Sequence, residues 1–376
     1  EKVMALETYD AFWPWEKGIA RRSIELSPAV SFGEEWLSEG EFVLQVIAVD
    51  QPNLWFWSRH VSEQRTFTLD LTPPRITVVS KQHYVRQGGS EAVLYEVSKD
   101  TVASGVQVGQ AVFTGYRLPE RGEWTYICLL ALAHDDSPET EMRLWAQDAA
   151  GNRGENILSK EIIPVRFRRR QIIMTDSLMN TVVPEILEHT QEVSGQETLV
   201  ETFLKINGPL RQINNGRVKE LSQQSANRIL WSEPFSQLSN SQVESAFADH
   251  RTYYYQGKAV DQQTHLGFDL ASIARSQVES ANEGIVLFAD YLGIYGNTVI
   301  VDHGLGLLSL YGHLSNIDVH KGERVQKDQR LGFTGQSGLA AGDHLHFSLF
   351  LHGVQVNPLE WWDPRWVNTH IWDRIR

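Results

Sequence analysis

One stretch of this sequence decides the fold of its C-terminal region: Asp343-His344-Leu345-His346-Phe347-Ser348-Leu349-Phe350-Leu351. Side chains of a β-strand alternate between its two faces. Four apolar side chains would therefore share a core-facing side: Leu345, Phe347, Leu349 and Leu351. His344, His346 and Ser348 would share the other face, with the Cα atoms of the two histidines about 6.6 Å apart. This spacing suits one histidine that binds a metal ion and a neighbouring histidine that acts on the molecule bound to the metal. A surface strand without a metal explains the same pattern.

A second segment, His265-Leu266-Gly267-Phe268-Asp269, combines an imidazole with a carboxylate. In a straight strand these two side chains would stand about 13 Å apart, which is too far to share one metal ion. Gly267 permits a bend that would bring them together. Imidazole and carboxylate ligands both suit zinc. The segment therefore predicts two further ligands, although the spacing alone is common by chance.

A third segment, Tyr311-Gly312-His313-Leu314, ends a predicted hairpin. Its first strand is residues 296–302, and its turn is residues 303–306. In a regular second strand, positions 307, 309, 311 and 313 fall on one face. We therefore expect His313 to point to the same place as His344.

Together, these segments resemble the lysostaphin-type (LytM-like) zinc metalloendopeptidases, which cut peptides in bacterial cell-wall peptidoglycan. The matching stretches occur in the family's order: 265–271, 295–299, 311–315, 321–325, 332–338, 344–347 and 356–359. Asp328 stands where the family usually has a glycine, and residues 340–342 vary the loop before the histidine strand. Neither departure falls on a residue expected to bind the metal.

The resemblance implies that His265, Asp269 and His346 bind zinc, and that His313 and His344 are the catalytic histidines. Three protein ligands leave the fourth zinc position open for water, whose pKa zinc lowers toward about 7. The sequence has no His-Glu-x-x-His motif that would supply a glutamate as general base. A histidine outside the ligand set must then take that role, and the sequence does not assign which one.

The leading functional hypothesis is a zinc endopeptidase that hydrolyses stem-peptide cross-links in peptidoglycan. A catalytically silent envelope scaffold that binds other cell-envelope proteins is an alternative, because some relatives have lost metal ligands and activate other wall enzymes. All five expected positions keep their residue here, which counts against that alternative. A zinc endopeptidase for glycine-rich proteins is a third possibility.

The N-terminal half contains segments that look like copies of one unit. Residues 40–70 and 122–152 both alternate β-branched and aromatic residues with polar ones and end at turn residues. Thr72-Pro73-Pro74 reads as a stiff linker between the copies. We predict β-sandwich domains over 1–72 and 73–165, which resemble bacterial immunoglobulin-like repeats.

Residues 166–229 have a helical pattern. Asp176 is expected to cap a first helix, and the capping box Ser194-Gly195-Gln196-Glu197 is expected to open a second, which ends at Asn207-Gly208-Pro209. A third helix is expected over 217–229. The segment is either a helical linker or an inhibitory plug over the site of the peptidase domain, which we place at 230–376. If upstream domains inhibit, residues 230–376 alone would be more active than the full chain.

The predicted fold class is therefore a mainly β multidomain chain: two β-sandwich domains, a short helical segment and a C-terminal antiparallel β-sheet metallopeptidase domain. The net charge of −13 argues against non-specific binding to nucleic acid or to an anionic membrane. The basic cluster of Arg166 with residues 168–170 is a local exception to this acidic charge. It is either a solvated surface patch or a binding site.

Cellular location is suggested by the ends and composition of the chain. No stretch of about 18 apolar residues that could span a membrane occurs. The sequence begins at Glu1 rather than at methionine, which fits the removal of a signal or anchor segment. We therefore expect an exported protein of the periplasm or cell envelope whose partners are peptidoglycan peptides.

Overall fold

The computed structural model describes residues 39–49, 60–195 and 197–376. Contacts divide the chain into two compact units. The first unit comprises Glu1–Pro73 with Ala150–Asn152, and the second comprises Pro74–Ala149 with Arg153–Arg376.

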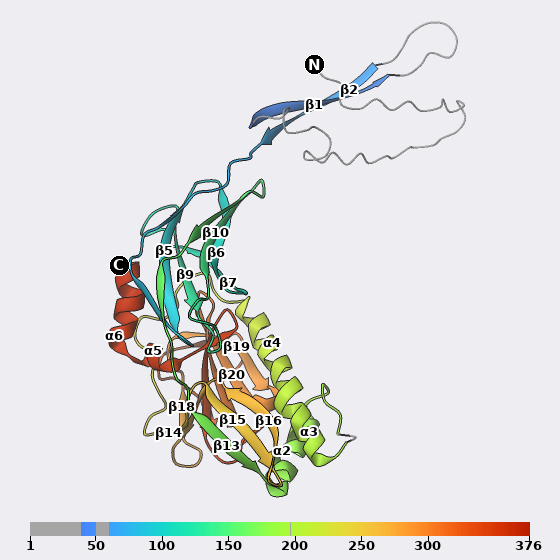
Figure 1. The fold of residues 1–376 in the computed structure, drawn as a ribbon, viewed down its shortest axis with the longest axis vertical. Coiled ribbons are helices and arrows are strands. Elements are labelled where there is room, and N and C mark those ends of the chain that lie inside the picture. The colour runs from blue at the N-terminus through green and yellow to red at the C-terminus, as the bar shows by residue number, and fades with distance from the viewer. Residues whose placement is uncertain (1–38, 50–59, 196) are drawn as a thin grey trace, which may run out of the picture. The chain divides into compact units, whose positions relative to one another are not determined.

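In the first unit, β1 (Gly40–Val49) pairs antiparallel with β2 (His60–Leu69), as Figure 1 shows. The register runs from Gly40 opposite Leu69 to Val49 opposite His60. The rest of the sandwich predicted for residues 1–72 lies outside the described residues.

The N-terminal part of the second unit is a β-sandwich. Its strands are β3 (Ile76–Val78), β4 (His83–Arg86), β5 (Ser90–Val97), β6 (Thr101–Val108), β7 (Ala111–Thr114), β8 (Tyr116–Arg117), β9 (Thr125–Ala131), β10 (Met142–Asp148), β11 (Arg153–Ile157) and β12 (Lys160–Ile163). An antiparallel sheet of order β3-β5-β9-β8 faces one of order β11-β10-β6-β7, and β4 pairs with β12. Val93, Ile127 and Leu144 meet in the shared core. The apolar faces of both sheets are thereby buried.

The C-terminal part is built on a larger antiparallel sheet. Its strands are β14 (Gln242–Ser245), β17 (Phe268–Ala271), β18 (Gln277–Glu279), β19 (Gly284–Tyr291), β20 (Asn297–Gly304), β21 (Leu307–Ile317), β22 (Arg324–Val325), β23 (Arg330–Thr334), β24 (Leu345–Leu351) and β25 (Val354–Val356). The central order is β14-β17-β24-β21-β20-β19-β22. A separate sheet joins β13 (Arg169–Met174), β15 (Asp249–Tyr255) and β16 (Lys258–His265). The predicted fold class, mainly β with a C-terminal antiparallel sheet, is confirmed.

The helical segment differs from the expected one at its boundaries. Helix α2 (Asp176–His189) is capped by Thr175, whose hydroxyl accepts from the Leu178 N–H, and Asp176 is its first residue. The capping box is formed by Thr198 and Glu201, not by residues 194–197, and it opens α3 (Leu199–Lys205). The predicted N-cap of α2 was therefore wrong by one residue, and that of α3 was wrong by four.

The chain does not leave the helical path at Asn207-Gly208-Pro209. A π-helical turn (Ile206–Leu210) joins α3 to α4 (Arg211–Ser222), which runs through Asn215-Gly216 and ends before the predicted 217–229 helix would. Phe203, Ile206, Leu210 and Val218 are buried along this path. Burial of this apolar stripe outweighs the weak helix propensity of the Gly and Pro positions.

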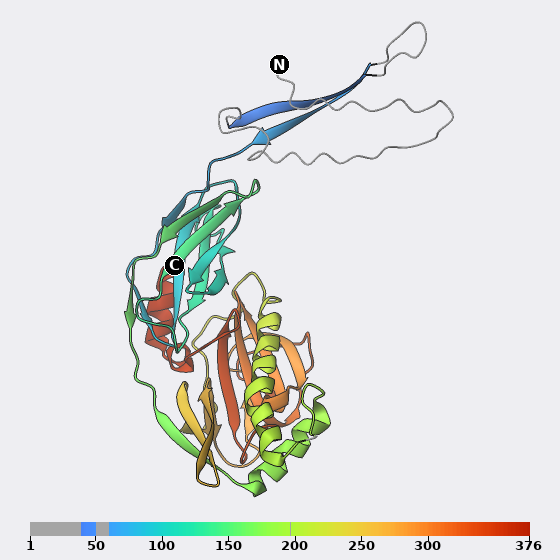
Figure 2. The same ribbon diagram turned by 45° about the vertical axis from the view of Figure 1, so that its right-hand side comes forward.

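These helices cover one face of the larger sheet (Figure 2). Buried residues of α2, α3 and α4 share a hydrophobic cluster with Ile300, Leu308, Leu310 and Phe350 of strands β20, β21 and β24. Strand β13 also pairs in parallel with β15. The segment that the sequence analysis treated as a linker or plug therefore provides a structural layer over the larger sheet.

We expect a chain that begins at residue 230 to be unstable rather than more active, because it would expose that sheet face to water. Its expected behaviour is aggregation or a loss of cooperative thermal unfolding, measured by circular dichroism and light scattering. A chain that begins at residue 74 keeps the second unit and is the matched control, with an expected melting temperature close to that of the full chain. A soluble, cooperatively folding 230–376 fragment would contradict this view.

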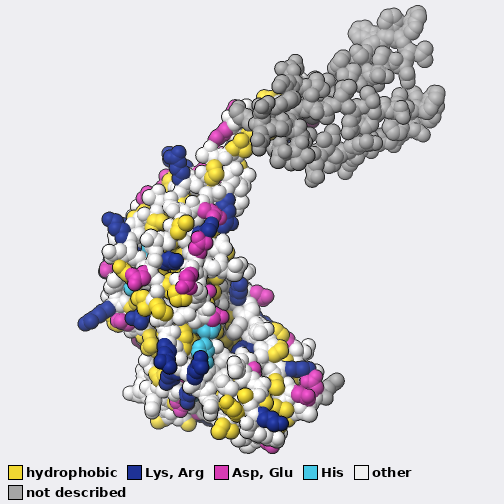
Figure 3. All heavy atoms as spheres, in the orientation of Figure 1, with side chains coloured by type: hydrophobic (Ala, Val, Ile, Leu, Met, Phe, Trp, Pro, Cys, Tyr) yellow, Lys and Arg dark blue, Asp and Glu magenta, His cyan; other side chains and the backbone are white. Residues whose placement is uncertain are grey.

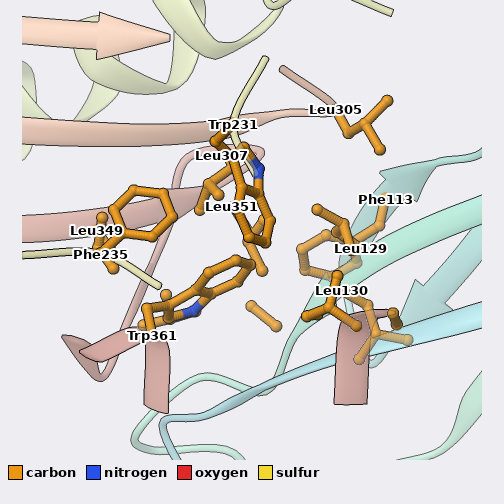
Figure 4. Close-up of a cluster of buried hydrophobic side chains, with 14 of the residues drawn as sticks. Phe113, Leu129, Leu130, Trp231, Phe235, Leu305, Leu307, Leu349, Leu351 and Trp361 are labelled. Carbon is orange, nitrogen blue, oxygen red and sulfur yellow. The ribbon is translucent and has the colours of Figure 1, made fainter. Parts of the chain in front are cut away.

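The sandwich and the larger sheet share a second hydrophobic cluster. Figure 4 shows Phe113, Leu129 and Leu130 of the sandwich beside Trp231 and Trp361 of the C-terminal part. The rings of the two tryptophans lie 5.6 Å apart at a steep angle. Such burial of large aromatic side chains stabilises the attachment of the sandwich to the C-terminal part.

Buried charges lie at the same junction. Glu91 accepts hydrogen bonds from Arg374 and His370. Burial by itself would raise the pKa of Glu91, but these partners outweigh burial and lower it. Glu360 instead accepts a bond from the Ser90 N–H at 2.8 Å, and burial raises the pKa of Glu360 to about 8. One buried carboxyl is therefore charged at neutral pH, whereas its neighbour is mostly protonated.

The raised pKa of Glu360 makes stability depend on pH. Its ordinary pKa is 4.5, so its contribution is complete below pH 4.5 and is lost as the pH rises through about 8. We expect Glu360→Gln, which stays uncharged, to reduce the loss of unfolding free energy between pH 5 and pH 9 by a few kcal/mol. Urea denaturation at each pH measures this, and Glu323→Gln is the matched control on a partly exposed side chain. An unchanged pH dependence in Glu360→Gln would contradict the assignment.

Candidate metal centre

The pairing of β17 with β24 places Asp269 directly opposite His346. The alternation predicted for β24 is confirmed, because Leu345, Phe347, Leu349 and Leu351 all lie in the main core cluster. His346 and Ser348 lie on the opposite face, so that the carboxylate and the imidazole meet across the strands.

His265 comes from a different sheet. It ends β16, where it pairs with Asp249, and the chain then crosses to β17 within two residues. A Cβ atom added at Gly267 would lie 2.6 Å from His346 Cε1 and 2.5 Å from Ser348 Oγ. Glycine is therefore required here by the close approach of the His346 ring, in addition to the bend that the sequence suggested.

The three predicted ligands converge. His265 Nε2 lies 2.9 Å from Asp269 Oδ1 and 3.1 Å from His346 Nδ1, and the last two atoms are 3.0 Å apart. All three residues are buried. Ligand atoms around one tetrahedral zinc with bonds near 2.0 Å are separated by about 3.3 Å. The triangle therefore fits three ligands of one metal ion, and its two imidazoles and one carboxylate are a donor set that zinc accepts.

Hydrogen bonds hold both ligand imidazoles in the required tautomer. His265 Nδ1 donates to the Ala246 carbonyl oxygen at 3.2 Å, which leaves Nε2 unprotonated. His346 Nε2 donates to Ser348 Oγ at 2.9 Å, since that hydroxyl itself donates to the Leu266 carbonyl at 2.8 Å. This leaves His346 Nδ1 unprotonated. Such second contacts orient metal ligands and raise their basicity.

The charge of Asp269 is fixed by its neighbours. Burial by itself would raise the pKa of Asp269, but the histidines around it hold that pKa well below its usual range. Arg251 donates from Nη2 to Asp269 Oδ2 at 2.7 Å. The carboxylate therefore stays ionised with Oδ1 directed at the other ligands. Arg251 was missed by the sequence analysis because it reaches Asp269 from β15, in the other sheet.

His313 reaches the site for a reason other than the one predicted. Regular alternation would place it with Ser309 and Tyr311, which lie on the core side. The register of β21 shifts between Tyr311 and Leu314 against β20, and His313 has a φ of +63°. This bulge turns the His313 side chain to the face of His346, with the rings 5.8 Å apart. The expectation of a regular strand was wrong, because the positive φ at His313 redirects its side chain.

His313 and His344 form a pair beside the three ligands. Their ring centroids lie 4.8 Å apart. His313 Nδ1 donates to the Ser337 carbonyl at 2.8 Å, and His344 Nδ1 donates to the Gly342 carbonyl at 2.8 Å. This leaves Nε2 of His313 as a proton acceptor. Nε2 of His344 lies 3.5 Å from Asp269 Oδ1, and although burial by itself would lower the pKa of His344, this carboxylate raises it. The structure thus brings all five predicted residues together.

A cavity of about 300 Å³ opens over the five residues. Its wall includes Ile172 of β13, Leu178 of α2 and Phe203 of α3. The segment 166–229 therefore forms one wall of the cavity over the site and does not fill it.

A family model matches the part of the chain that contains this site. The model described as Peptidase family M23 matches residues 263–358, which include all five site residues. Residues 263–358 are an M23 peptidase domain. The elements from β3 to β15 precede the matched residues.

Individual relatives match over the same region. "Peptidoglycan DD-endopeptidase ShyA" of Vibrio cholerae is 35% identical over 26% of this chain and 22% of its own length. "Murein hydrolase activator EnvC" of Escherichia coli is 34% identical over 25% of this chain and 23% of its own length. The matches thus span less than a quarter of these relatives. A crystal structure described as a putative peptidase M23 from Pseudomonas aeruginosa shares 19% identity and a TM-score of 0.44, covering 74% of this chain and 94% of that chain.

We expect Gly267→Ala to weaken zinc binding by about 10-fold to 100-fold, because the added methyl group would displace the His346 ring and Ser348 Oγ. Competition with a chelating dye measures the affinity. Gly216→Ala is the matched control, since a Cβ atom at that helical position meets nothing within 4 Å. Equal zinc affinity in Gly267→Ala and the wild-type protein would show that this close approach does not position the ligand.

Proposed function

We propose that this protein is a zinc-dependent endopeptidase that hydrolyses stem-peptide cross-links of bacterial peptidoglycan. The observation that carries the proposal is the convergence of three ligand atoms, 2.9–3.1 Å apart, beside a pair of histidines outside the ligand set. The similarity to the peptidoglycan DD-endopeptidase ShyA supports peptidoglycan as the substrate class.

His265, Asp269 and His346 would hold the zinc ion. A zinc ion bound by three protein ligands supplies a Lewis acid for the scissile carbonyl and lowers the pKa of a coordinated water. Arg251 holds Asp269 Oδ2 by a hydrogen bond, and Ser348 keeps His346 in the tautomer with a free Nδ1. These contacts preorganise the ligands before a substrate arrives.

His313 and His344 would carry the proton transfers. Because each ring donates from Nδ1 to a backbone carbonyl, each presents Nε2 toward the cavity side of the site. One imidazole would accept the proton of the attacking water through Nε2 and pass this proton to the leaving amine, while the other, in its protonated form, would donate a hydrogen bond to the tetrahedral oxyanion. Burial, together with His344 and His346, holds the pKa of His313 well below its usual range, which keeps this ring neutral near pH 7.

The cellular setting follows from the substrate. Cross-linked peptidoglycan lies in the cell envelope, so the proposal places the protein in the periplasm or cell envelope, with peptidoglycan peptides and other envelope proteins as partners. Within the described residues, no helix has the length and apolar character that crossing a membrane requires.

The similarity to EnvC favours one other candidate, an activator of murein hydrolases without activity of its own. The five site residues argue for the enzyme. An activator needs neither a convergent ligand triangle nor imidazoles whose tautomers are fixed by hydrogen bonds.

Digestion of cross-linked muropeptides by the zinc-loaded full chain, followed by mass spectrometry, tests the function. We expect cross-links to be cleaved. His346→Ala should lose bound zinc and activity together, whereas His344→Ala should keep zinc and lose about 10²-fold to 10⁴-fold in rate. A glycine-rich peptide incubated in parallel tests the alternative that the protein is an endopeptidase for glycine-rich proteins.

His320→Ala is the matched control for these variants, because the His320 side chain is 83% exposed and pairs with Glu323. It should behave like the wild-type protein. Intact muropeptides after incubation with zinc-loaded protein, or an undiminished rate in His344→Ala, would refute the peptidase proposal and favour the activator.

A further inference from the structure

A second, larger cavity of about 900 Å³ adjoins the metal centre. Arg211, Arg251, Tyr295 and His346 line both this cavity and the smaller one over the ligands. The two spaces therefore meet at the ligand His346. A volume of this size accommodates several residues of a peptide.

The larger cavity is cationic in a strongly acidic protein. Among the described residues, Arg169, Arg211 and Arg251 line it, against the single carboxylate of Asp135. The whole chain has a net charge of −13. Figure 3 shows arginine or lysine and histidine side chains gathered where the sandwich meets the peptidase part. A local reversal of sign inside a cavity attracts an anionic ligand.

Two of these arginines are held in place by the fold. Arg211 donates from Nε and Nη2 to the backbone and side-chain oxygens of Asn207, at 2.9 and 2.7 Å. Asn207 is itself fixed by a bond to Asp261 at 2.7 Å. Arg251 donates from Nη2 to Asp269, yet its buried Nε has no hydrogen-bond partner in the described structure. A guanidinium has more N–H groups than these bonds use, so both arginines retain donors for a ligand.

Most of this cavity comes from outside the M23 domain. Arg169 lies on β13, Arg211 on α4 and Arg251 on β15, and all precede residue 263, where the family match begins. The sandwich contributes His134 and Asp135. The additional elements of this chain therefore build a binding space that the M23 domain by itself lacks.

We propose that this cavity is a carboxylate-binding subsite, in which Arg169, Arg211 and Arg251 receive the free carboxylates of a peptide whose scissile bond lies over the metal centre. The inference rests on the proposed function and narrows it to carboxylate-bearing peptides. Planar guanidinium groups pair with carboxylates through parallel hydrogen bonds, which gives orientation as well as affinity. The subsite thus orients the substrate relative to His346.

Binding to the full zinc-loaded chain tests the subsite separately from catalysis. The probes are an uncross-linked stem tetrapeptide with free carboxylates and the same peptide with its carboxylates amidated, titrated by calorimetry. We expect the free acid to bind about 10-fold or more tightly than the amide. Arg211→Gln should reduce this ratio to near one, and Arg169→Gln, on another element, should lower it as well.

Arg330→Gln is the matched control, since Arg330 pairs with Asp318 on a different part of the domain and its side chain is 53% exposed. It should leave the ratio unchanged. Equal binding of acid and amide, binding of neither, or a ratio that survives both cavity variants would overturn the subsite. A glycerol phosphate oligomer that binds more tightly than the free acid would overturn the carboxylate assignment. Cleavage of amidated and free muropeptides at equal rates would sink the inference while the peptidase function stands.

Discussion

The metal centre depends on the close approach of the chain at Gly267 to the imidazole of His346. The backbone passes from one sheet to the other at this point, and any side chain there would meet the ring and Ser348. Because the crossing is so short, His265 at the end of β16 and Asp269 in β17 both lie close to Nδ1 of His346 in β24. The pairing of Asp269 with His346 then completes the triangle. A ligand set spread over 81 residues is thereby held within about one hydrogen-bond length.

The rest of the second unit supports this crossing from outside the M23 domain. Helices α2 to α4 bury one face of the larger sheet, and β13 extends the sheet that carries His265. The sandwich is attached through a shared aromatic core and the buried Glu91 and Glu360. These additions also create the cationic cavity beside His346. Elements that stabilise the sheet therefore supply the surroundings in which a substrate would be oriented.

Several features of the site were predictable, and others were not. The alternation at residues 344–351 correctly separated the core face from the ligand face, and Gly267 was correctly seen as the break before Asp269. His313 was expected at the site by regular alternation, but it arrives there through a bulge with positive φ. Arg251 gave no local signal, since its partner lies in another sheet. The N-caps Thr175 and Thr198 were missed because a nearby Asp and Ser offered equally suitable cap residues. The helical path through Gly208, Pro209 and Gly216 was missed because burial of an apolar stripe outweighs their weak helix propensity.

The sequence by itself determined the strand periodicity, the chemical types of the five site residues and the resemblance that groups them. These properties are local, because the period of a strand and the donor atoms of a side chain do not depend on distant contacts. Tertiary structure alone decided the tautomers of His265 and His346, the ionised state of Asp269, the direction of His313 and the cationic cavity. Each of these depends on a hydrogen bond, a charge or a wall supplied by a residue far away in the chain, and such partners are fixed only when the sheets, helices and sandwich pack together.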